Sequence, residues 1–217
     1  MHQALEREPE IGAVYLTSPN MEGLVADYQA IRQVCTPNNV LLIVDEAHGA
    51  HSYFNPQMPT GALKGGADAT VCSVHKTLGA LSASALINVA TNSRLPASKV
   101  KDAYHLLNTT SPSPLLLADV ESCVRTLKKE GGVIIDRAIN LNKKLRESIS
   151  KLPSVIIGNF ENSEFKLDPT KLVFKIKGLA GHELSDILDT MRINIEKSTQ
   201  KCIVVTTHIN ITEEDID

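Results

Sequence analysis

The chain is poor in aromatic side chains and has no tryptophan: aromatics make up 4% of its 217 residues. Surfaces that bind single-stranded nucleic acid need such rings for base stacking, so we expect no nucleic-acid partner. The formal net charge is −3, from 22 basic and 25 acidic residues, and no basic stripe stands out. The composition therefore gives no support for binding to polyanions.

Cysteines and long apolar runs are also scarce. The four cysteines lie far apart in the sequence and lack zinc-binding spacing, so we expect neither a metal site nor a disulfide framework from them. No apolar run reaches the roughly 18 residues that a membrane span needs. The first residues lack the basic and apolar segments of a signal peptide. We therefore expect a cytoplasmic protein with no membrane partner.

What the chain does contain is ordinary for a globular protein, with 42% hydrophobic and 22% charged residues. Its first part alternates strand and helix patterns. Ala13–Thr17 predicts a strand, residues 27–35 a helix and residues 40–44 a second strand. This βαβ order predicts an α/β fold with parallel strands. Ala69–Ser73 and residues 84–89 predict two more strands, for which the short connection allows antiparallel pairing.

The second part of the chain is helical and then mixed. Residues 97–107, 115–129 and 133–149 have helical patterns, and Gly131 and Gly132 predict a break between the last two. After Pro153, strand patterns at residues 155–157, 171–176 and 202–207 surround a short helix at residues 181–191. We therefore expect a large domain over residues 1–112, connecting helices over 113–151 and a small, incomplete α+β lobe over 152–217.

Two strand ends carry the residues of chemical interest. Asp45 follows the apolar run 40–44, with His48 close behind it, and Lys76 follows the strand Ala69–Ser73. A carboxylate and an amine on neighbouring strand ends suit a pyridoxal phosphate (PLP) site. The amine forms a Schiff base with the aldehyde, and the carboxylate keeps the pyridine nitrogen protonated so that the ring accepts electrons.

Other interpretations of these residues remain open at this point. A lone lysine is most often a solvated surface group, and an acid after a strand is often a helix cap or a loop charge. The run from Asp45 to His48 also spells the DEAH box of helicases, which requires a glycine-rich P-loop that this sequence lacks. A metal site made of Asp45, His48 and His51 is a third interpretation. No second cluster with ligand spacing supports it, and we expect no metal.

Several motifs, in the same order, resemble those of the Orn/Lys/Arg decarboxylases, which are PLP enzymes of the aspartate aminotransferase fold (fold type I). The resemblance extends over nearly the whole chain. The motifs are Thr17-Ser18-Pro19 with Gly23, Asp45-Glu46-Ala47-His48-Gly49-Ala50-His51, Gly66-Ala67-Asp68, Ser73-Val74-His75-Lys76-Thr77-Leu78, and Tyr104-His105-Leu106-Leu107 with Thr109-Thr110-Ser111-Pro112-Ser113. The Ser-x-His-Lys-Thr and Thr-Thr-Ser-Pro-Ser signatures together are specific, whereas Asp-x-Ala-His is shared by several fold type I families.

The resemblance implies a role for each matching residue. Lys76 would carry PLP covalently, Asp45 would pair with the pyridinium nitrogen, and Lys76 or His75 would return a proton to the substrate carbon. The remaining cofactor contacts implied are Ala47 on the ring face, His48 near the phenolic oxygen, Ser73 and His75 near the phosphate or the Schiff base, and Ser18. Ser111 and its neighbours would lie at a dimer interface, which implies a homo-oligomer.

The implied activity is PLP-dependent decarboxylation of a basic amino acid, namely arginine, lysine or ornithine, in polyamine metabolism. Family members also carry an upstream half with a glycine-rich phosphate loop, so we interpret the chain as an N-terminally truncated member. Two alternatives stay open. The chain could be an inactive remnant or partner subunit, or it could have another fold type I activity such as that of an aminotransferase.

Overall fold

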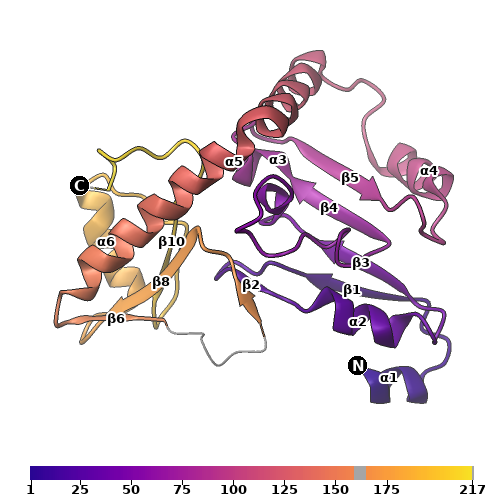
Figure 1. Ribbon diagram of the computed structural model, residues 1–217, viewed down its shortest axis with the longest axis horizontal. Helices are drawn as coiled ribbons and strands as arrows, with labels where there is room; N and C mark the ends of the chain where they lie inside the picture. The colour runs from indigo at the N-terminus through magenta and orange to yellow at the C-terminus, as the bar shows by residue number, and fades with distance from the viewer. Residues whose placement is uncertain (159–164, 217) are drawn as a thin grey trace.

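The computed structural model describes residues 1–158 and 165–216. The described residues form two four-stranded sheets connected by one long helix, and a two-stranded sheet (Figure 1). The elements of the first sheet region are α1 (His2–Arg7), β1 (Ala13–Thr17), β2 (Leu24–Val25), α2 (Tyr28–Cys35), β3 (Leu41–Asp45), the 3-10 helix η1 (Ala50–Tyr53), β4 (Ala69–Ser73), α3 (Val74–Thr77), β5 (Ala85–Val89) and α4 (Ala97–Leu107).

The first sheet has the strand order β1-β3-β4-β5. β1, β3 and β4 run parallel, and β5 pairs with β4 in the antiparallel direction. The expected α/β fold with a mainly parallel sheet is therefore confirmed. The antiparallel option for the fourth strand is also confirmed. A short connection through α3 permits this pairing, whereas parallel pairing would need a longer crossover.

Helix α2 supplies the crossover between β1 and β3 and covers one face of the sheet. Asp27 caps it, because its side chain accepts a hydrogen bond of 3.0 Å from the backbone N–H of Ala30. Tyr28 packs in one core cluster with Leu42 and Val44, which are both fully buried on β3. Burial of this apolar face is the main force that holds the crossover on the sheet.

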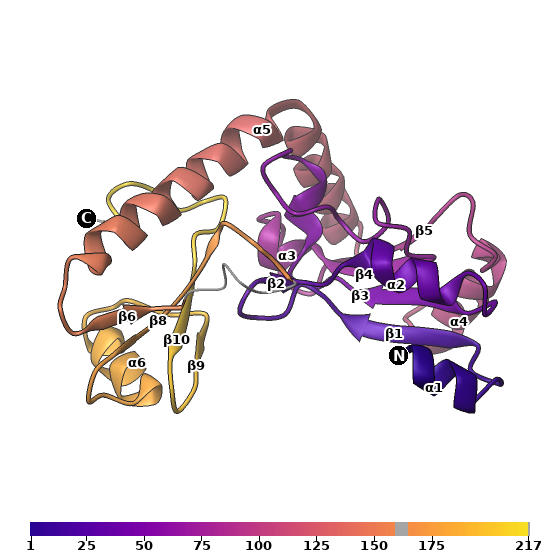
Figure 2. The same ribbon diagram turned by 60° about the horizontal axis from the view of Figure 1, so that its bottom comes forward.

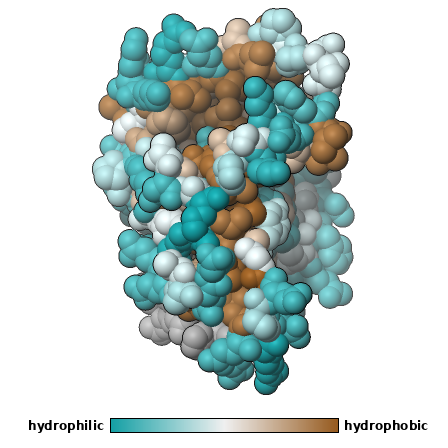
Figure 3. Space-filling model, turned by 90° about the vertical axis from the view of Figure 1, so that its right-hand side faces the viewer, coloured by the Kyte–Doolittle hydropathy of each residue, from teal (hydrophilic) through white to brown (hydrophobic). Residues whose placement is uncertain are grey.

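The opposite face of the first sheet is open to solvent within this chain. Tyr15, Val71 and Ile87 lie on it and are 63%, 37% and 47% exposed. Leu106 and Leu107 at the end of α4 are each 85% exposed. Figure 3 views the molecule from the side of β5 and α4 and shows hydrophobic side chains gathered there between hydrophilic ones. Parallel sheets are normally covered on both faces, so this apolar surface is suited to further packing.

The expected break at Gly131 and Gly132 is wrong, because α5 (Pro114–Ser150) is one continuous helix of 37 residues. Figure 2 shows that this helix bends along its length rather than ending. Close packing against Phe54 explains why a glycine stands at position 131. A Cβ atom there would lie 2.8 Å from Cβ of Phe54, so only glycine lets the helix approach so closely. A helix tolerates such a glycine at a cost of about 1 kcal/mol.

The second sheet has the order β6-β8-β10-β9 with antiparallel pairing throughout. Its elements are β6 (Val155–Ile157), β7 (Lys166–Leu167), β8 (Lys171–Ile176), α6 (Gly181–Thr190), β9 (Lys197–Ser198) and β10 (Ile203–Thr206). The three strands and the helix expected after Pro153 are all present. We call this part, residues 152–158 and 165–216, the small lobe; the domain boundaries themselves stay a prediction.

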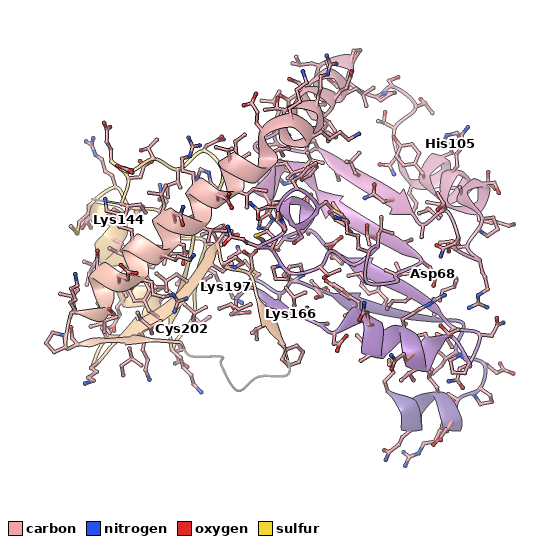
Figure 4. The ribbon with its side chains drawn as sticks, viewed as in Figure 1. Asp68, His105, Lys144, Lys166, Lys197 and Cys202 are labelled. Atoms are coloured by element: carbon pink, nitrogen blue, oxygen red, sulfur yellow. The ribbon has the colours of Figure 1, made fainter. Side chains whose placement is uncertain are left out.

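The small lobe contacts the first sheet region in several places. β7 pairs with β2, which places residues 166–167 against residues 24–25. Lys197 forms an ion pair of 2.8 Å with Glu22, and Figure 4 shows Lys197 where the small lobe approaches the first sheet region. The backbone N–H of Asp168 also donates to the carbonyl of Gly23 at 2.8 Å. Within the described part of the chain, no helix is both long and apolar enough to cross a membrane.

Candidate active site

The candidate site lies at the C-terminal ends of β3 and β4. Asp45, the last residue of β3, is in register with Val71 on the neighbouring parallel strand. β4 leads directly into α3, which carries Lys76. The carboxylate and the amine therefore come from adjacent strand ends, as the sequence predicts. This is the sheet edge where open α/β folds bind their ligands.

Lys76 is solvent-exposed, and its Nζ lies 3.4 Å from Nε2 of His48. His48 is buried, and its Nδ1 lies 3.9 Å from Oε1 of Glu196 in the small lobe. Burial, followed by the positive charges of Lys171 and Lys76, lowers the pKa of His48 to about 4. The imidazole is therefore neutral at pH 7 and offers Lys76 one nitrogen lone pair.

Two hydrogen bonds orient the half-buried Asp45 carboxylate. Its Oδ1 accepts from the backbone N–H of Ala47 at 3.0 Å, and its Oδ2 accepts from the Tyr15 hydroxyl at 3.2 Å. Ala47 itself is half-buried, two residues beyond the strand. Tyr15 was not among the residues singled out in the sequence. Its position is visible only from the register that aligns β1 with β3.

The other predicted cofactor contacts flank Lys76. Ser73 is the N-terminal cap residue of α3 and is half-buried. Nδ1 of His75 lies 2.8 Å from the carbonyl oxygen of Ser84. A carbonyl only accepts, so this contact places the imidazole proton on Nδ1 and leaves Nε2 free to accept or, when protonated, to donate.

Ser18 has a different environment from the rest of the predicted set. It is 2% exposed, and its Oγ accepts from the backbone N–H of Ala26 at 2.9 Å and from the Tyr28 hydroxyl at 2.8 Å. Its backbone N–H donates to the carbonyl of Asp45 at 2.9 Å. Ser18 thus supports the strand end that carries Asp45. Its direct contact with a cofactor stays a prediction.

Two acids within the family motifs, Glu46 and Asp68, have structural roles in the fold. Glu46 is 1% exposed and accepts hydrogen bonds from the Tyr53 hydroxyl at 2.6 Å and from the backbone N–H of Ala62 at 2.7 Å. Asp68 lies at the start of β4, the end remote from the site, and pairs with Arg32 at 2.6 Å (Figure 4). Neither carboxylate is available to a ligand near Lys76.

The small lobe adds charged residues that sequence reasoning missed. Glu196 lies beside His48, and Lys171 is 2% exposed and donates from Nζ to Oγ1 of Thr206 at 2.7 Å. Burial lowers the pKa of Lys171 against the opposing influence of Glu196 and Asp168. The sequence offered no signal for either residue, since a lysine in an alternating strand predicts a solvated side chain.

The described structure does not support a metal site made of Asp45, His48 and His51. Nε2 of His51 lies 3.0 Å from Oδ2 of Asp168 in the small lobe. Among the described residues, no group of three or more His, Cys, Asp or Glu side chains is arranged to hold a metal ion.

The residues present fit PLP. An accessible amine at Lys76, a neutral imidazole beside it and an oriented carboxylate at Asp45 are the groups that the aldehyde and the pyridinium of PLP require. Lys76 would hold the aldehyde carbon and Asp45 the ring nitrogen.

Comparisons with known proteins agree with this chemistry. The family described as "Orn/Lys/Arg decarboxylase, major domain" matches residues 2–165. An arginine decarboxylase of Bacillus cereus is 30% identical over 220 residues, which cover 98% of this chain and 48% of that protein. The chain thus spans about half the length of this curated relative.

Solved structures share the fold. A lysine decarboxylase of Francisella novicida superposes with a TM-score of 0.79 at 20% identity, over 94% of this chain and 34% of that chain. An alanine–glyoxylate aminotransferase of Nostoc superposes with a TM-score of 0.76 at 17% identity, over all of this chain and 61% of that one. Because the family match covers most of the sequence, the chain belongs to the Orn/Lys/Arg decarboxylase family.

Proposed function

We propose that this chain takes part in the PLP-dependent decarboxylation of a basic amino acid, with arginine as the first candidate. The observation that carries the proposal is the contact between Lys76 and neutral His48, next to the Asp45 carboxylate on the adjacent strand. Relatives named arginine decarboxylase support the choice of substrate. The proposed setting is polyamine metabolism in the cytoplasm.

The reaction breaks the bond between Cα and the carboxylate of the amino acid. CO2 leaves, the electron pair stays behind, and a proton is added at Cα to give the corresponding amine. PLP, when bound, supplies the electron sink that makes this cleavage feasible. The Asp45 carboxylate would stabilise the positive ring nitrogen of bound PLP, and its hydrogen bonds from Tyr15 and Ala47 hold it in a fixed orientation.

The remaining residues handle protons and substrate charge. His48 accepts a hydrogen bond from Lys76 through Nε2, which holds the amine in position for bond formation. Lys76, or His75 through Nε2, returns a proton to Cα. Glu196 is the carboxylate next to this pair and is about one-third exposed, so we propose that it pairs with the distal cation of the substrate.

The test is covalent capture of PLP by Lys76. The purified chain with PLP should develop the absorbance band of a PLP–lysine adduct, and borohydride should fix the label on the peptide that contains Lys76. Lys76→Ala should abolish both signals, whereas Lys101→Ala, which removes an exposed lysine of α4, should change neither. A chain that shows no band and no label is not a working enzyme by itself, which would favour the remnant or partner-subunit alternative.

Product analysis separates the decarboxylase from an aminotransferase, the fold of which is equally similar. Release of CO2 and an amine from arginine supports the proposal. Formation of a keto acid without CO2 would replace it.

We also propose that the chain forms a homo-oligomer. The apolar side chains on the open sheet face and at the end of α4 support this, since burying them in an interface is favourable. Sedimentation should show a species larger than 23.6 kDa. A monomer at all tested concentrations would refute it.

A further inference from the structure

A buried polar cluster lies where η1, α3 and the turn before β8 meet, outside the residues proposed to contact the cofactor. It consists of His51 from η1, Thr77 at the end of α3, and Asp168 and Thr170 from the small lobe. The His51 and Asp168 side chains are 4% and 1% exposed. Charged side chains are rarely buried so completely unless they have partners.

Asp168 is held rigidly. Its Oδ1 accepts from the backbone N–H of Thr170 at 2.8 Å and from the Thr170 hydroxyl at 2.7 Å. Its Oδ2 lies 3.0 Å from Nε2 of His51. Burial by itself raises the pKa of Asp168, but the charge of the adjacent His51 and the hydrogen bonds from Thr170 outweigh this and lower it. Asp168 is therefore an anion that fixes the His51 ring with Nε2 toward the small lobe.

Three buried polar atoms of the cluster lack a hydrogen-bond partner among the described residues. One is Oδ2 of Asp168, which lies at ion-pair distance from Nε2 of His51 but without hydrogen-bond geometry. Among the described residues, neither Nδ1 of His51 nor Oγ1 of Thr77 has a hydrogen-bond partner, although both atoms are buried. Both residues line a cavity of about 10 Å³, together with Thr170 and Thr207. This volume is about what one water molecule needs, and the walls offer several polar groups. Leaving both atoms unpaired would cost free energy comparable to lost hydrogen bonds.

We propose that one water molecule occupies this cavity and joins Nδ1 of His51 to Oγ1 of Thr77. Asp168, His51, the water and Thr77 then form one continuous chain of polar contacts from the small lobe to the helix that carries Lys76. His51 and Thr77 are positioning residues in this scheme. Its consequence for catalysis rests on the proposed function, because it assumes that Lys76 is the reactive amine.

The proton positions follow from the geometry. Nε2 of His51 lies 3.0 Å from the Asp168 anion and carries a proton, so Nδ1 is the ring nitrogen that can accept a hydrogen bond. The water donates to Nδ1 and accepts from the Thr77 hydroxyl. Thr77 is the neighbour of Lys76 in a helix of only four residues, so this link fixes the direction in which Lys76 leaves α3.

A crystal structure of the chain at high resolution tests the water directly. It should show one water within hydrogen-bond distance of both atoms, about 2.7–3.2 Å. Density for no water, with both atoms still unpaired, would overturn the proposal. This outcome does not depend on PLP, so it leaves the proposed function standing.

Denaturation of Thr77→Val and Thr77→Ser gives an independent test. The change in the unfolding midpoint of Thr77→Val has opposite signs with and without the bound water. If the hydroxyl is unpaired, valine removes a buried polar atom and the unfolding midpoint rises. If the water binds it, valine removes a hydrogen bond and the midpoint falls, whereas serine keeps it close to wild type. A midpoint that rises in Thr77→Val overturns the proposal.

The positioning role is measured by the reactivity of Lys76 in the chain without added PLP. Trace acylation followed by peptide mass spectrometry compares Lys76 with Lys101 in the same sample. Loss of the link should free Lys76 from His48 and raise its relative acylation rate about threefold or more in Thr77→Val, but not in Thr77→Ser. Equal rates in both variants would refute the positioning role. Absence of a PLP adduct in the capture experiment would instead refute the proposed function.

Discussion

Replacing Asp168 with asparagine removes a buried charge while keeping the size of the side chain. The amide oxygen of asparagine can keep the two hydrogen bonds from Thr170 to Oδ1, at 2.7 and 2.8 Å. The loss is therefore confined to the contact of 3.0 Å between Oδ2 and His51. In place of a carboxylate oxygen, His51 meets an amide N–H₂ group, which is a donor.

The expected cost follows from that contact. Removing one partner of a buried ion pair costs about 3–5 kcal/mol. Because asparagine keeps half of the contacts and His51 can shift its proton to Nδ1, we expect a loss of about 2–3 kcal/mol at pH 7. Urea denaturation of wild type and Asp168→Asn measures this as a lower midpoint with an unchanged slope.

The difference in unfolding free energy between wild type and Asp168→Asn should also depend on pH. The folded-state pKa of Asp168 is lowered below that of the unfolded chain, so the carboxylate stabilises the fold above the unfolded value of about 4. This contribution disappears as the pH falls through the lowered folded-state pKa. The gap between wild type and Asp168→Asn should therefore narrow below about pH 4.

Asp186→Asn is the matched control, because Asp186 is exposed on α6. It should change stability by no more than about 0.5 kcal/mol at either pH. If Asp168→Asn is as stable as wild type at pH 7, or if the gap does not change with pH, the Asp168–His51 pair does not stabilise the fold and the reasoning fails.

Two further predictions concern α5 and His48. Gly131→Ala should destabilise the chain by about 1–3 kcal/mol, because the new Cβ would lie 2.8 Å from Cβ of Phe54. Nothing lies within 4 Å of the Cβ position at Gly132, so Gly132→Ala should stabilise the chain by about 0.5–1 kcal/mol. Thermal unfolding of both variants measures these changes, and equal effects of the two substitutions would contradict the prediction. His48 has a folded-state pKa of about 4, below the unfolded value of about 6.5, so the unfolded state takes up the proton first. Stability of the wild type should therefore fall by about 1–3 kcal/mol from pH 6.5 to pH 4, a loss that His48→Gln should lack when both are followed by urea denaturation.

Periodicity and strand-end chemistry were enough to predict the first sheet. Alternating strand and helix patterns with short connections allow few topologies, and parallel strands place Asp45 and the Lys76 segment at one edge of the sheet whatever the details of packing. The family resemblance came from contiguous motifs and could be recognised in the same way. The expected helix break at Gly131 was wrong because the local sequence pattern does not show tertiary contacts. It could not show that Phe54 packs against α5 at this glycine.

The sequence by itself thus determined the α/β class, the family and the positions of Asp45, His48 and Lys76. Only the tertiary structure decided what surrounds them. It placed Glu196 beside His48, buried Lys171, committed Glu46 and Asp68 to the fold, and joined His51 to Asp168 across 117 positions of sequence. The physical reason is that pairing between distant charges depends on how two lobes pack. Neither propensity nor spacing along the chain records that packing.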